Sequence, residues 1–513
     1  MTSDMTSSRS LPLVFLYISV SWLCITGYRR IIGTKKRRLL LPPGPPGKPI
    51  IGNALDIPVH NAWHKASQWA KQYGDIVYVD AVGQPIVYLN SFEVTQDLLE
   101  KRSSIYSDRG DAPMLKDLVG FDWNFAFMPH GDEWRAHRKI FHQNFNFKAV
   151  AAFQPSQRKH VHFMMRDMYE APSQFYNHIK RLSIAIIMDA IYGLEIQREN
   201  DPYIKIADEA LEYLTEAATP GAFLVDVFPS LKLVPEWFPG AGFKTKAKKW
   251  RVPVTKLATE PFNAAKRAFE AGKINTSLTY SWLDKLSRHP DEEYRKGMEK
   301  AISNVGGTAY VGGFETTSST LAFFILAMMT HPGVQKRAHA ELDHVVGSKR
   351  MPEYSDLANL PYLNAIYKEV LRWRPVVPLG VPHRATQDDM YKGMLIPKGC
   401  IILCNQWLML RNEKAYGPDP DTFNPERFLK PGVPDPIAAF GFGRRICPGR
   451  YLADNTILMA IVSTLHLFDI VPKANAKEVH FTTGFLLHPK PFECDIRLRG
   501  SEALNLLETL ERD

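Results

Sequence analysis

The residues from Phe440 to Gly449, which read FGFGRRICPG, place a cysteine on a glycine-rich loop. Glycines there allow a tight turn and a close approach to another group. Cys447 comes just before a helix expected from Tyr451, where the helix dipole and free N–H groups favour a thiolate. The neighbouring Arg444 and Arg445 add cationic groups that could meet acidic substituents. A thiolate fixed in this way is what an axial ligand to haem iron requires. A lone cysteine is more often a buried inert thiol, so this interpretation depends on the loop around it.

The same segment matches the cysteine-ligand signature of the cytochrome P-450 family, F-x-x-G-x-R-x-C-x-G, at every fixed position. Other landmarks of that family occur in the right order between Trp134 and Gly449. The chain therefore resembles haem-thiolate monooxygenases, and is most similar to fungal (basidiomycete) microsomal members. The resemblance implies haem b (iron protoporphyrin IX) as cofactor, with Cys447 as the metal ligand.

A glutamate and an arginine stand three residues apart at Glu369 and Arg372, where they can meet on one helix face. Taken alone, such a pair is usually solvated at the surface. By resemblance it is the E-x-x-R pair of the family, and Arg427 in the segment PERF resembles the third member of a structural triad. The resemblance implies a buried clamp behind the haem.

A glycine pair precedes an acid and an alcohol in the segment GGFETT, residues 312–317. The segment resembles the oxygen-activation motif of the family, with Glu315 and Thr316 as catalytic residues that deliver protons during O–O cleavage. Many relatives carry aspartate where this chain has Glu315, and the carboxylate function is kept. The alternative is a polar pair whose hydroxyl bonds back to its own helix.

Four further residues resemble those that hold the haem propionates. Trp134 and Arg138 match W-x-x-x-R, four residues apart on one helix face, while His383 and Arg445 resemble additional propionate partners. A lone histidine is more often structural than liganding.

Apolar and aromatic segments between the motifs are the candidate substrate wall. They predict a lipophilic, bulky small-molecule substrate, although each residue could equally belong to the ordinary core. The candidates are Phe121, Phe125, Phe127, Val377, Leu379 and Phe485.

The elements that must position these residues are mainly helical, with a minor β part, as the cytochrome P-450 fold implies. A helix-compatible stretch covers residues 298–330, and its four glycines (Gly306, Gly307, Gly312, Gly313) indicate close approach by other groups. Further helices are expected at 61–73, capped and closed by Gly74, and at 332–346, 361–374 and 451–468, with strands at 76–80, 85–90, around 396–403 and near 481–487.

The N-terminal segment from residue 10 to residue 28 carries no charge and is as long as a membrane span. Six basic residues follow it before residue 39, which predicts that its C-terminal side is cytosolic. We expect a short lumenal segment (1–9), one transmembrane helix (10–28), a basic, proline-rich linker (29–50) and one catalytic domain (51–513). Competing interpretations of residues 10–28 are a buried core helix and a cleaved signal peptide.

Composition restricts the compartment and the partners of this chain. It has 513 residues, a net charge of +9 and five scattered cysteines, which favour a reducing compartment over a disulfide framework. It contains neither a dinucleotide fingerprint nor a P-loop, so a redox reaction would need electrons from another protein. No motif supports nucleic-acid binding. Trp237–Gly240 beside clustered lysines indicates membrane contact or a solvated basic face, and basic residues (Arg135, Arg138, Lys139, Arg444) would offer a face for an acidic reductase.

These observations predict a monooxygenase of the endoplasmic reticulum membrane, single-pass, with its catalytic domain in the cytosol. It would insert one atom of O₂ into a terpenoid, an aromatic secondary metabolite or a xenobiotic, with NADPH electrons delivered by NADPH–cytochrome P-450 reductase. One alternative is a haem-thiolate isomerase or dehydratase that acts on a peroxide without a reductase. Another is a haem-binding sensor without catalysis, which would need neither the acid–alcohol pair nor a wide apolar pocket.

Overall fold

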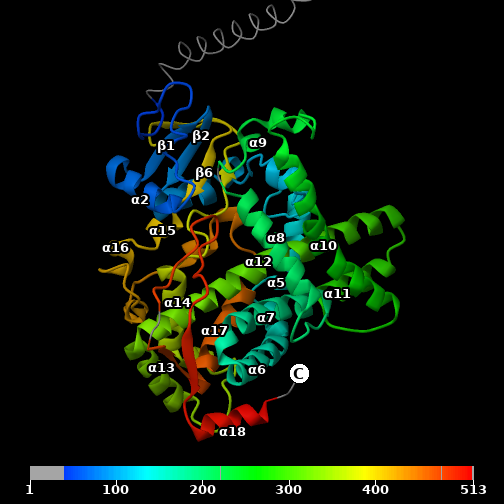
Figure 1. Cartoon of the computed structure of the whole chain (residues 1–513), viewed down its shortest axis with the longest axis vertical. Helices are drawn as coiled ribbons and strands as arrows, with labels where there is room; N and C mark the ends of the chain where they lie inside the picture. The colour runs from blue at the N-terminus through cyan, green and yellow to red at the C-terminus, as the bar shows by residue number, and fades with distance from the viewer. Residues whose placement is uncertain (1–39, 220, 475–476, 511–513) are drawn as a thin grey trace, which may run out of the picture.

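The computed structural model describes residues 40–219, 221–474 and 477–510. They form a mainly helical molecule with three small sheets, and the sheet that contains β1, β2 and β6 lies at one end of it (Figure 1). The helices are α2 (Ala62–Tyr73), α3 (Phe92–Gln96), α4 (Ser103–Tyr106), α5 (Asp132–Phe145), α6 (Gln154–Glu170), α7 (Phe175–Ile187), α8 (Pro202–Ala217), α9 (Leu224–Val227), α10 (Gly242–Glu270), α11 (Leu278–Ser287), α12 (Glu292–Thr330), α13 (Pro332–Val345), α14 (Pro361–Trp373), α15 (Gln406–Met409), α16 (Glu413–Tyr416), α17 (Arg450–Leu467) and α18 (Ser501–Thr509).

The largest sheet joins strands from the two ends of the chain. Its order is β1 (Ile76–Ala81), β2 (Gln84–Leu89), β6 (Ile401–Cys404) and β3 (His383–Arg384), and β2 pairs with β6 in parallel, with Ile86 opposite Ile401. The remaining strands form two antiparallel pairs, β4 (Asp389–Tyr391) with β5 (Met394–Ile396) and β7 (Phe468–Pro472) with β8 (Cys494–Leu498).

The 39-residue helix α12 runs through the middle of the molecule, in contact with α5, α7, α14 and α17 (Figure 1). Three of its glycines are needed for that packing, because an added Cβ would lie 2.6–2.7 Å from a side chain of another segment: Tyr192 at Gly306, Trp123 at Gly307 and Ile187 at Gly313. The predicted close approach is confirmed at these three positions. At Gly312 an added Cβ would meet nothing within 4 Å, since this residue faces a cavity.

The sequence predicts the long helices better than the strands. The helices expected at 298–330, 332–346, 361–374 and 451–468 are confirmed as α12, α13, α14 and α17 with small shifts of their ends. The helix at 61–73 is present as α2, but the Asn61 side chain makes no cap hydrogen bond. The strand expected around 396–403 is two strands separated by a turn, and 481–487 contributes one isolated bridge, Phe481 with Pro489.

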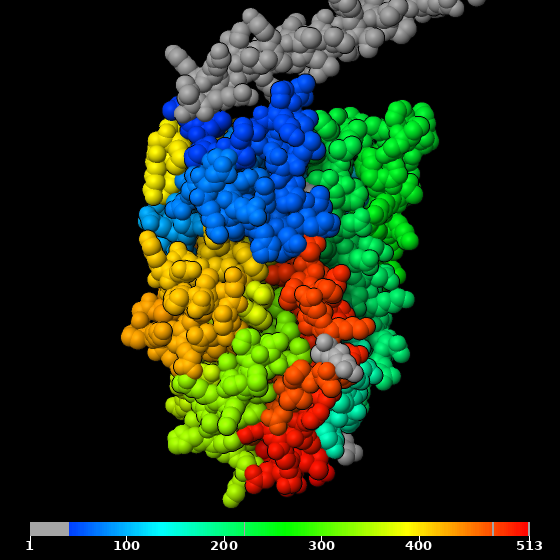
Figure 2. All heavy atoms as spheres, turned by 60° about the vertical axis from the view of Figure 1, so that its left-hand side comes forward, coloured from blue at the N-terminus to red at the C-terminus, as the bar shows by residue number. Residues whose placement is uncertain are grey.

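That turn near the C-terminus lies against the N-terminal part of the domain, as Figure 2 shows where the red-orange segment meets the blue one. Asn61 N donates to Thr483 O at 2.8 Å, and Thr483 Oγ1 lies 2.8 Å from His60 Nδ1. The segment therefore has a fixed position over the body of the protein.

Within the described residues, one helix (α12) is long and apolar enough to cross a membrane, but 72% of its most apolar window is buried inside the protein. It is a core helix. The predicted transmembrane helix at 10–28 lies outside the described residues.

Candidate active site

A large cavity brings together residues as far apart in the chain as Arg109 and Leu486. Its wall is built by α5, α7, α8, α12, the segment after α14, the loop before α17 and the start of α17 itself. All seven residues predicted to hold the cofactor or to act in chemistry line it: Trp134, Arg138, Glu315, Thr316, His383, Arg445 and Cys447.

Cys447 is held by a backbone that requires glycine. Gly441 and Gly443 have φ values of 82° and 57°, and a Cβ at Gly443 would collide with Leu99 O. Cys447 N donates to Phe440 O at 2.8 Å, which closes the loop and directs the residue to the cavity wall.

Without a bound metal, the Cys447 thiol keeps its proton. Burial raises the pKa of this thiol, although the Gly449 backbone N–H and the Arg138 charge act in the opposite direction. The backbone N–H at the helix end does act in the expected direction, but desolvation outweighs it in the metal-free protein. A metal cation supplies the missing stabilisation, since coordination deprotonates a thiol outright.

Four arginines line the cavity (Arg109, Arg138, Arg374 and Arg445), none of them within ion-pair distance of a carboxylate among the described residues, and three of them share a further property. Arg109 and Arg445 are buried and Arg138 is half-buried, yet every hydrogen bond that they form is to a backbone carbonyl: Arg109 to Ala126, Val381 and Pro382; Arg138 to Ile446; Arg445 to Ser107, Phe125 and Met128. We call these three residues the cavity arginines. Burial lowers the pKa to about 10 for Arg109, about 10 for Arg138 and about 8 for Arg445, and the Arg109 charge adds to the effect at Arg445.

Two further predicted residues adjoin the cavity arginines. The Arg445 guanidinium carbon lies 4.2 Å from the centroid of the Trp134 ring. His383 Nδ1 donates to Tyr106 O at 2.8 Å, and burial, with Arg109 second, holds the pKa of this imidazole well below its usual range. A neutral His383 leaves Nε2 as an acceptor, so contact with an anion would require it to take up a proton.

The cavity has the chemistry that a haem needs. A buried cation is costly unless an anion accompanies it, and three such cations gather here within reach of one cavity. The two carboxylates of an iron porphyrin would supply the anions, the Cys447 sulfur would supply the axial ligand, and the apolar wall would cover the ring. The residues present therefore fit this cofactor.

The acid–alcohol pair lies on the α12 side of the cavity. Thr316 Oγ1 donates to Gly312 O at 2.6 Å, which is the back-bonded arrangement weighed as the alternative, while its lone pairs stay available to accept. The Glu315 side chain is 16% exposed and its Oε1 lies 3.4 Å from His488 Nδ1. Burial raises the pKa of Glu315 against the opposing effect of Lys180, so the carboxyl tends to keep a proton.

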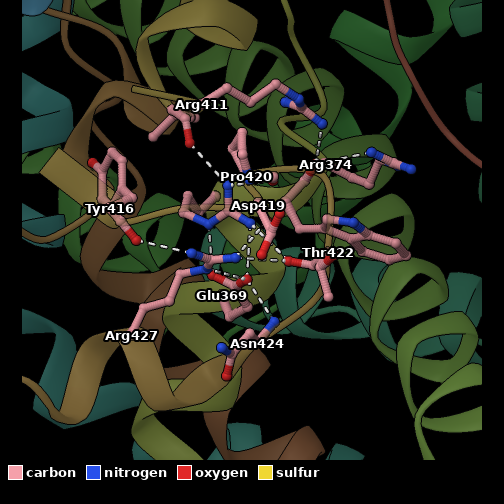
Figure 3. A network of polar contacts seen from close by, with 12 residues as sticks. Glu369, Arg374, Arg411, Tyr416, Asp419, Pro420, Thr422, Asn424 and Arg427 are labelled. Carbon is pink, nitrogen blue, oxygen red and sulfur yellow. Dashed lines mark hydrogen bonds and ion pairs between the residues drawn. The ribbon is translucent and has the colours of Figure 1, made fainter. Parts of the chain in front are cut away.

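Glu369, Arg372 and Arg427 meet in a network of residues that do not line the cavity. Figure 3 shows Glu369 and Arg427 in this network. Arg372 donates to both carboxylate oxygens of Glu369 at 2.6 and 2.8 Å, and Arg427 Nε donates at 3.2 Å. The remaining N–H groups of the two arginines go to backbone carbonyls, those of Leu410, Tyr416, Pro418, Asp419, Pro420 and Thr422. Glu369 and Arg372 are completely buried, so this network ties α14 to the segment 410–427.

The candidate substrate residues divide into two groups. Phe125, Phe127, Val377 and Phe485 line the cavity. Phe121 and Leu379 do not, which corrects the prediction for both. Phe121 is fully buried with its ring against Trp123 and Phe127, and Leu379 packs against core residues beside the first sheet.

Arg109 is a cavity residue that the sequence did not suggest. It lies on a loop with no periodic pattern, and its hydrogen-bond partners come from residues 126, 381 and 382. No motif or spacing near residue 109 could have identified it, because the contacts that define it are all long-range.

Comparison with known proteins agrees with this site. The model of the cytochrome P450 family matches residues 42–496 of this chain. A cytochrome P-450 monooxygenase of Armillaria gallica is 39% identical, with 98% of this chain and 99% of the relative covered, and one of Rhodocybe pseudopiperita is 40% identical, with 97% and 96% covered. The tryptamine 4-monooxygenase of Psilocybe cyanescens is 39% identical, with 91% and 95% covered.

The fold and the cysteine-centred cavity define a haem-thiolate enzyme. The chain belongs to the cytochrome P-450 family and is a monooxygenase of that family. The family implies haem, O₂ and a small-molecule substrate.

Proposed function

We propose that this enzyme inserts one atom of O₂ into a lipophilic, uncharged molecule, a terpenoid or an aromatic secondary metabolite or xenobiotic. NADPH would supply the electrons through NADPH–cytochrome P-450 reductase. The observation that carries the proposal is one cavity that contains both Cys447 and the Glu315–Thr316 pair, with mainly apolar residues between them.

In this proposal each group of cavity residues has a separate role. Cys447 binds the iron of haem b, while the cavity arginines, Trp134 and His383 hold its carboxylates. The bound haem supplies the activation of O₂. Glu315 holds a proton on the opposite wall, and Thr316 offers a hydroxyl for passing protons into the cavity. Phe125, Phe127, Val377 and Phe485 exclude water and orient the substrate.

The charge of the cavity wall supports an uncharged substrate. Among the described lining residues, Glu315 is the one carboxylate, and burial raises its pKa. A protonated amine would lose its hydration there without gaining an ionised partner. We therefore prefer a neutral substrate to an amine such as the one in the name of the Psilocybe relative.

The proposal places the enzyme on the endoplasmic reticulum membrane with its catalytic domain in the cytosol. Residues 10–28 are the proposed single-pass anchor. Figure 1 shows β1, β2 and α9 at one end of the molecule. Large apolar side chains are exposed in α9 and in segments that precede β1 or follow α9 in the chain: Ile50 (93% exposed), Leu55 (72%), Leu224 (67%), Leu233 (85%) and Trp237 (80%). Exposed apolar side chains gathered at one end are typical of a membrane contact.

The proposed reductase contact lies on the side of the Cys447 loop. Arg135, Lys139 and Arg444 are exposed there and would attract an acidic flavoprotein surface.

The first experiment is the carbon monoxide difference spectrum of dithionite-reduced, haem-loaded protein in microsomes. We expect a strongly red-shifted Soret band that Cys447→Ala abolishes. Cys494→Ala is the matched control, because Cys494 is buried in β8 outside the cavity and its loss should leave the band unchanged. A wild-type protein without the band would overturn the proposed ligand.

Screening of neutral terpenes and aromatic molecules with reductase and NADPH then tests the reaction. Formation of a hydroxylated product that contains oxygen from labelled O₂ supports the proposal. Products formed from an organic peroxide without reductase would instead support the isomerase or dehydratase reaction, and haem binding without any turnover would support a sensor.

A further inference from the structure

The turn between residues 481 and 489 holds its histidine in a fixed position. Thr482 N donates to His488 O at 3.0 Å, and His488 N donates back to Thr482 Oγ1 at 2.9 Å. Leu487 N donates to Val376 O at 2.8 Å, and the Tyr176 hydroxyl donates to Pro489 O. The backbone of His488 is therefore anchored on both sides, which leaves its imidazole little freedom to move.

The imidazole of His488 lies between Glu315 and solvent. Its Nδ1 is 3.4 Å from Glu315 Oε1, and its side chain is 31% exposed while that of Glu315 is 16% exposed. Glu315 in turn lines the cavity. These three observations describe a continuous connection from solvent through His488 to Glu315 and into the active site.

The charges around this pair come from other helices. Lys180 on α7 acts on both groups and is itself paired with Asp208 on α8 at 2.8 Å. Asp208 and the Tyr176 hydroxyl are further titratable groups that interact with Glu315. Burial, with Lys180 second, lowers the pKa of His488 to about 4, whereas burial raises the pKa of Glu315. The carboxyl therefore takes up a proton more readily than an ordinary glutamate does, and the imidazole is uncharged at neutral pH.

We propose that His488 is a positioning residue that returns protons from solvent to Glu315 after each proton delivery into the cavity. This inference rests on the proposed monooxygenase function, because that reaction consumes two protons for each oxygen atom reduced to water. The distance of 3.4 Å exceeds a normal hydrogen bond, so a small approach of the two side chains accompanies each transfer.

The proton balance of this step is closed. When Glu315 gives its proton to the cavity, the new carboxylate beside Nδ1 favours the imidazolium, which His488 forms by taking one proton from water. The imidazolium then gives its Nδ1 proton to Glu315 Oε1, and both groups return to their neutral states. One proton enters from solvent for each proton used.

The test begins with a readout that does not depend on turnover. In haem-loaded protein, the infrared carbonyl band of protonated Glu315 is identified by its loss in Glu315→Gln. We expect this band to shift in His488→Gln and to persist to higher pH, since the variant removes the imidazole that stabilises the ionised carboxylate. An unchanged band in position and pH dependence would overturn the proposed contact.

Kinetics then test the proton return, using the neutral probe that the wild-type protein oxidises fastest in the screen above. For His488→Gln we expect an unchanged carbon monoxide spectrum and KM, kcat reduced about tenfold, a larger solvent isotope effect and more NADPH diverted to hydrogen peroxide. Free imidazole should restore part of kcat in His488→Ala, because the site is reachable from solvent.

His480→Gln is the matched control, since His480 is an exposed histidine just before the same turn. It should keep wild-type kcat and isotope effect. If His488→Gln keeps them too, or if its loss of kcat comes with a loss of the haem spectrum, the proposal is overturned. If the wild-type protein oxidises no probe, the proposed function fails, and the infrared band still decides whether Glu315 and His488 interact.

Discussion

Two groups of buried arginines in this protein differ in how their charge is balanced. In the Glu369 network, Arg372 and Arg427 share one buried carboxylate, and backbone carbonyls accept the remaining N–H groups (Figure 3). The cavity arginines also donate to backbone carbonyls, but no described carboxylate forms an ion pair with them, and Asp108 acts on Arg109 and Arg445 only from beyond ion-pair distance. The protein itself supplies the counter-charge for Arg372 and Arg427, whereas the charge of the cavity arginines is balanced only when an anion binds.

This difference separates a structural role from a binding role. Buried ion pairs lose much of their attraction to desolvation, so an internally paired network contributes mainly by fixing the segments that it joins. An unpaired buried cation costs free energy in the empty site and recovers it when an anion binds. The position of the missing carboxylate therefore locates the haem carboxylates more clearly than any single motif does.

The largest effect should come from Glu369→Gln, which leaves Arg372 and Arg427 buried without an anion. We expect a loss of about 3–5 kcal/mol in the free energy of unfolding of the haem-loaded protein, measured with guanidinium chloride. Glu426→Gln is the control, because Glu426 pairs with Arg337 at a half-exposed site and should cost less than about 1 kcal/mol. Equal losses in the two variants would remove the distinction between the network and a surface ion pair.

A smaller effect, of a different kind, is expected for Arg109→Gln. Removing one cavity arginine should weaken haem binding by about 2 kcal/mol, or about 30-fold, seen as faster haem transfer to an acceptor protein such as apomyoglobin. Arg181→Gln is the control, since Arg181 is a buried arginine paired with Asp167 at 2.8 Å. That variant should lose stability yet keep its haem, and a similar haem loss in both would contradict the comparison.

The sequence predicts the Glu369 network more completely than it predicts the cavity arginines, and the reason is the distance along the chain between the residues in contact. Glu369 and Arg372 are one helical turn apart, so their contact follows from local geometry, and Arg427 follows from the resemblance to the family. Arg109 depends on carbonyls up to 273 residues away, which no local pattern records. At Cys447 the helix end that lowers the pKa of the thiol is readable from the sequence, whereas the burial that raises it is not.

The same reasoning explains the fold. Long apolar helices such as α12 and α17 follow from long helix-compatible stretches that no proline interrupts, and the glycines of α12 predict close packing. The pairing of β2 with β6 joins strands about three hundred residues apart, and β7 with β8 were not predicted at all. Phe121 and Phe125 share one alternating segment, yet only the tertiary fold decides which of them reaches the cavity.

The smallest expected effect concerns His383, which lies beside the cavity arginines. In haem-free protein its pKa is well below the ordinary 6.5 because of burial and the Arg109 charge, so the unfolded chain binds a proton that the folded chain does not. Stability should therefore fall as the pH drops below about 6.5, by about 1 kcal/mol between about pH 6 and about pH 5. His383→Gln should lack this part of the decline in urea unfolding.

Haem should change the result for His383 and not for a histidine outside the cavity. A bound carboxylate would favour the imidazolium of His383, which raises its pKa and flattens the decline in haem-loaded protein. His466 is the matched control, because burial lowers its pKa to about 4 but its Nε2 faces Arg350 O, away from the cavity lining. His466→Gln should remove a similar decline with and without haem. If haem leaves the His383-dependent change of stability with pH unchanged, no anion binds beside this histidine. That result would contradict the assignment of the neighbouring cavity arginines to the haem carboxylates.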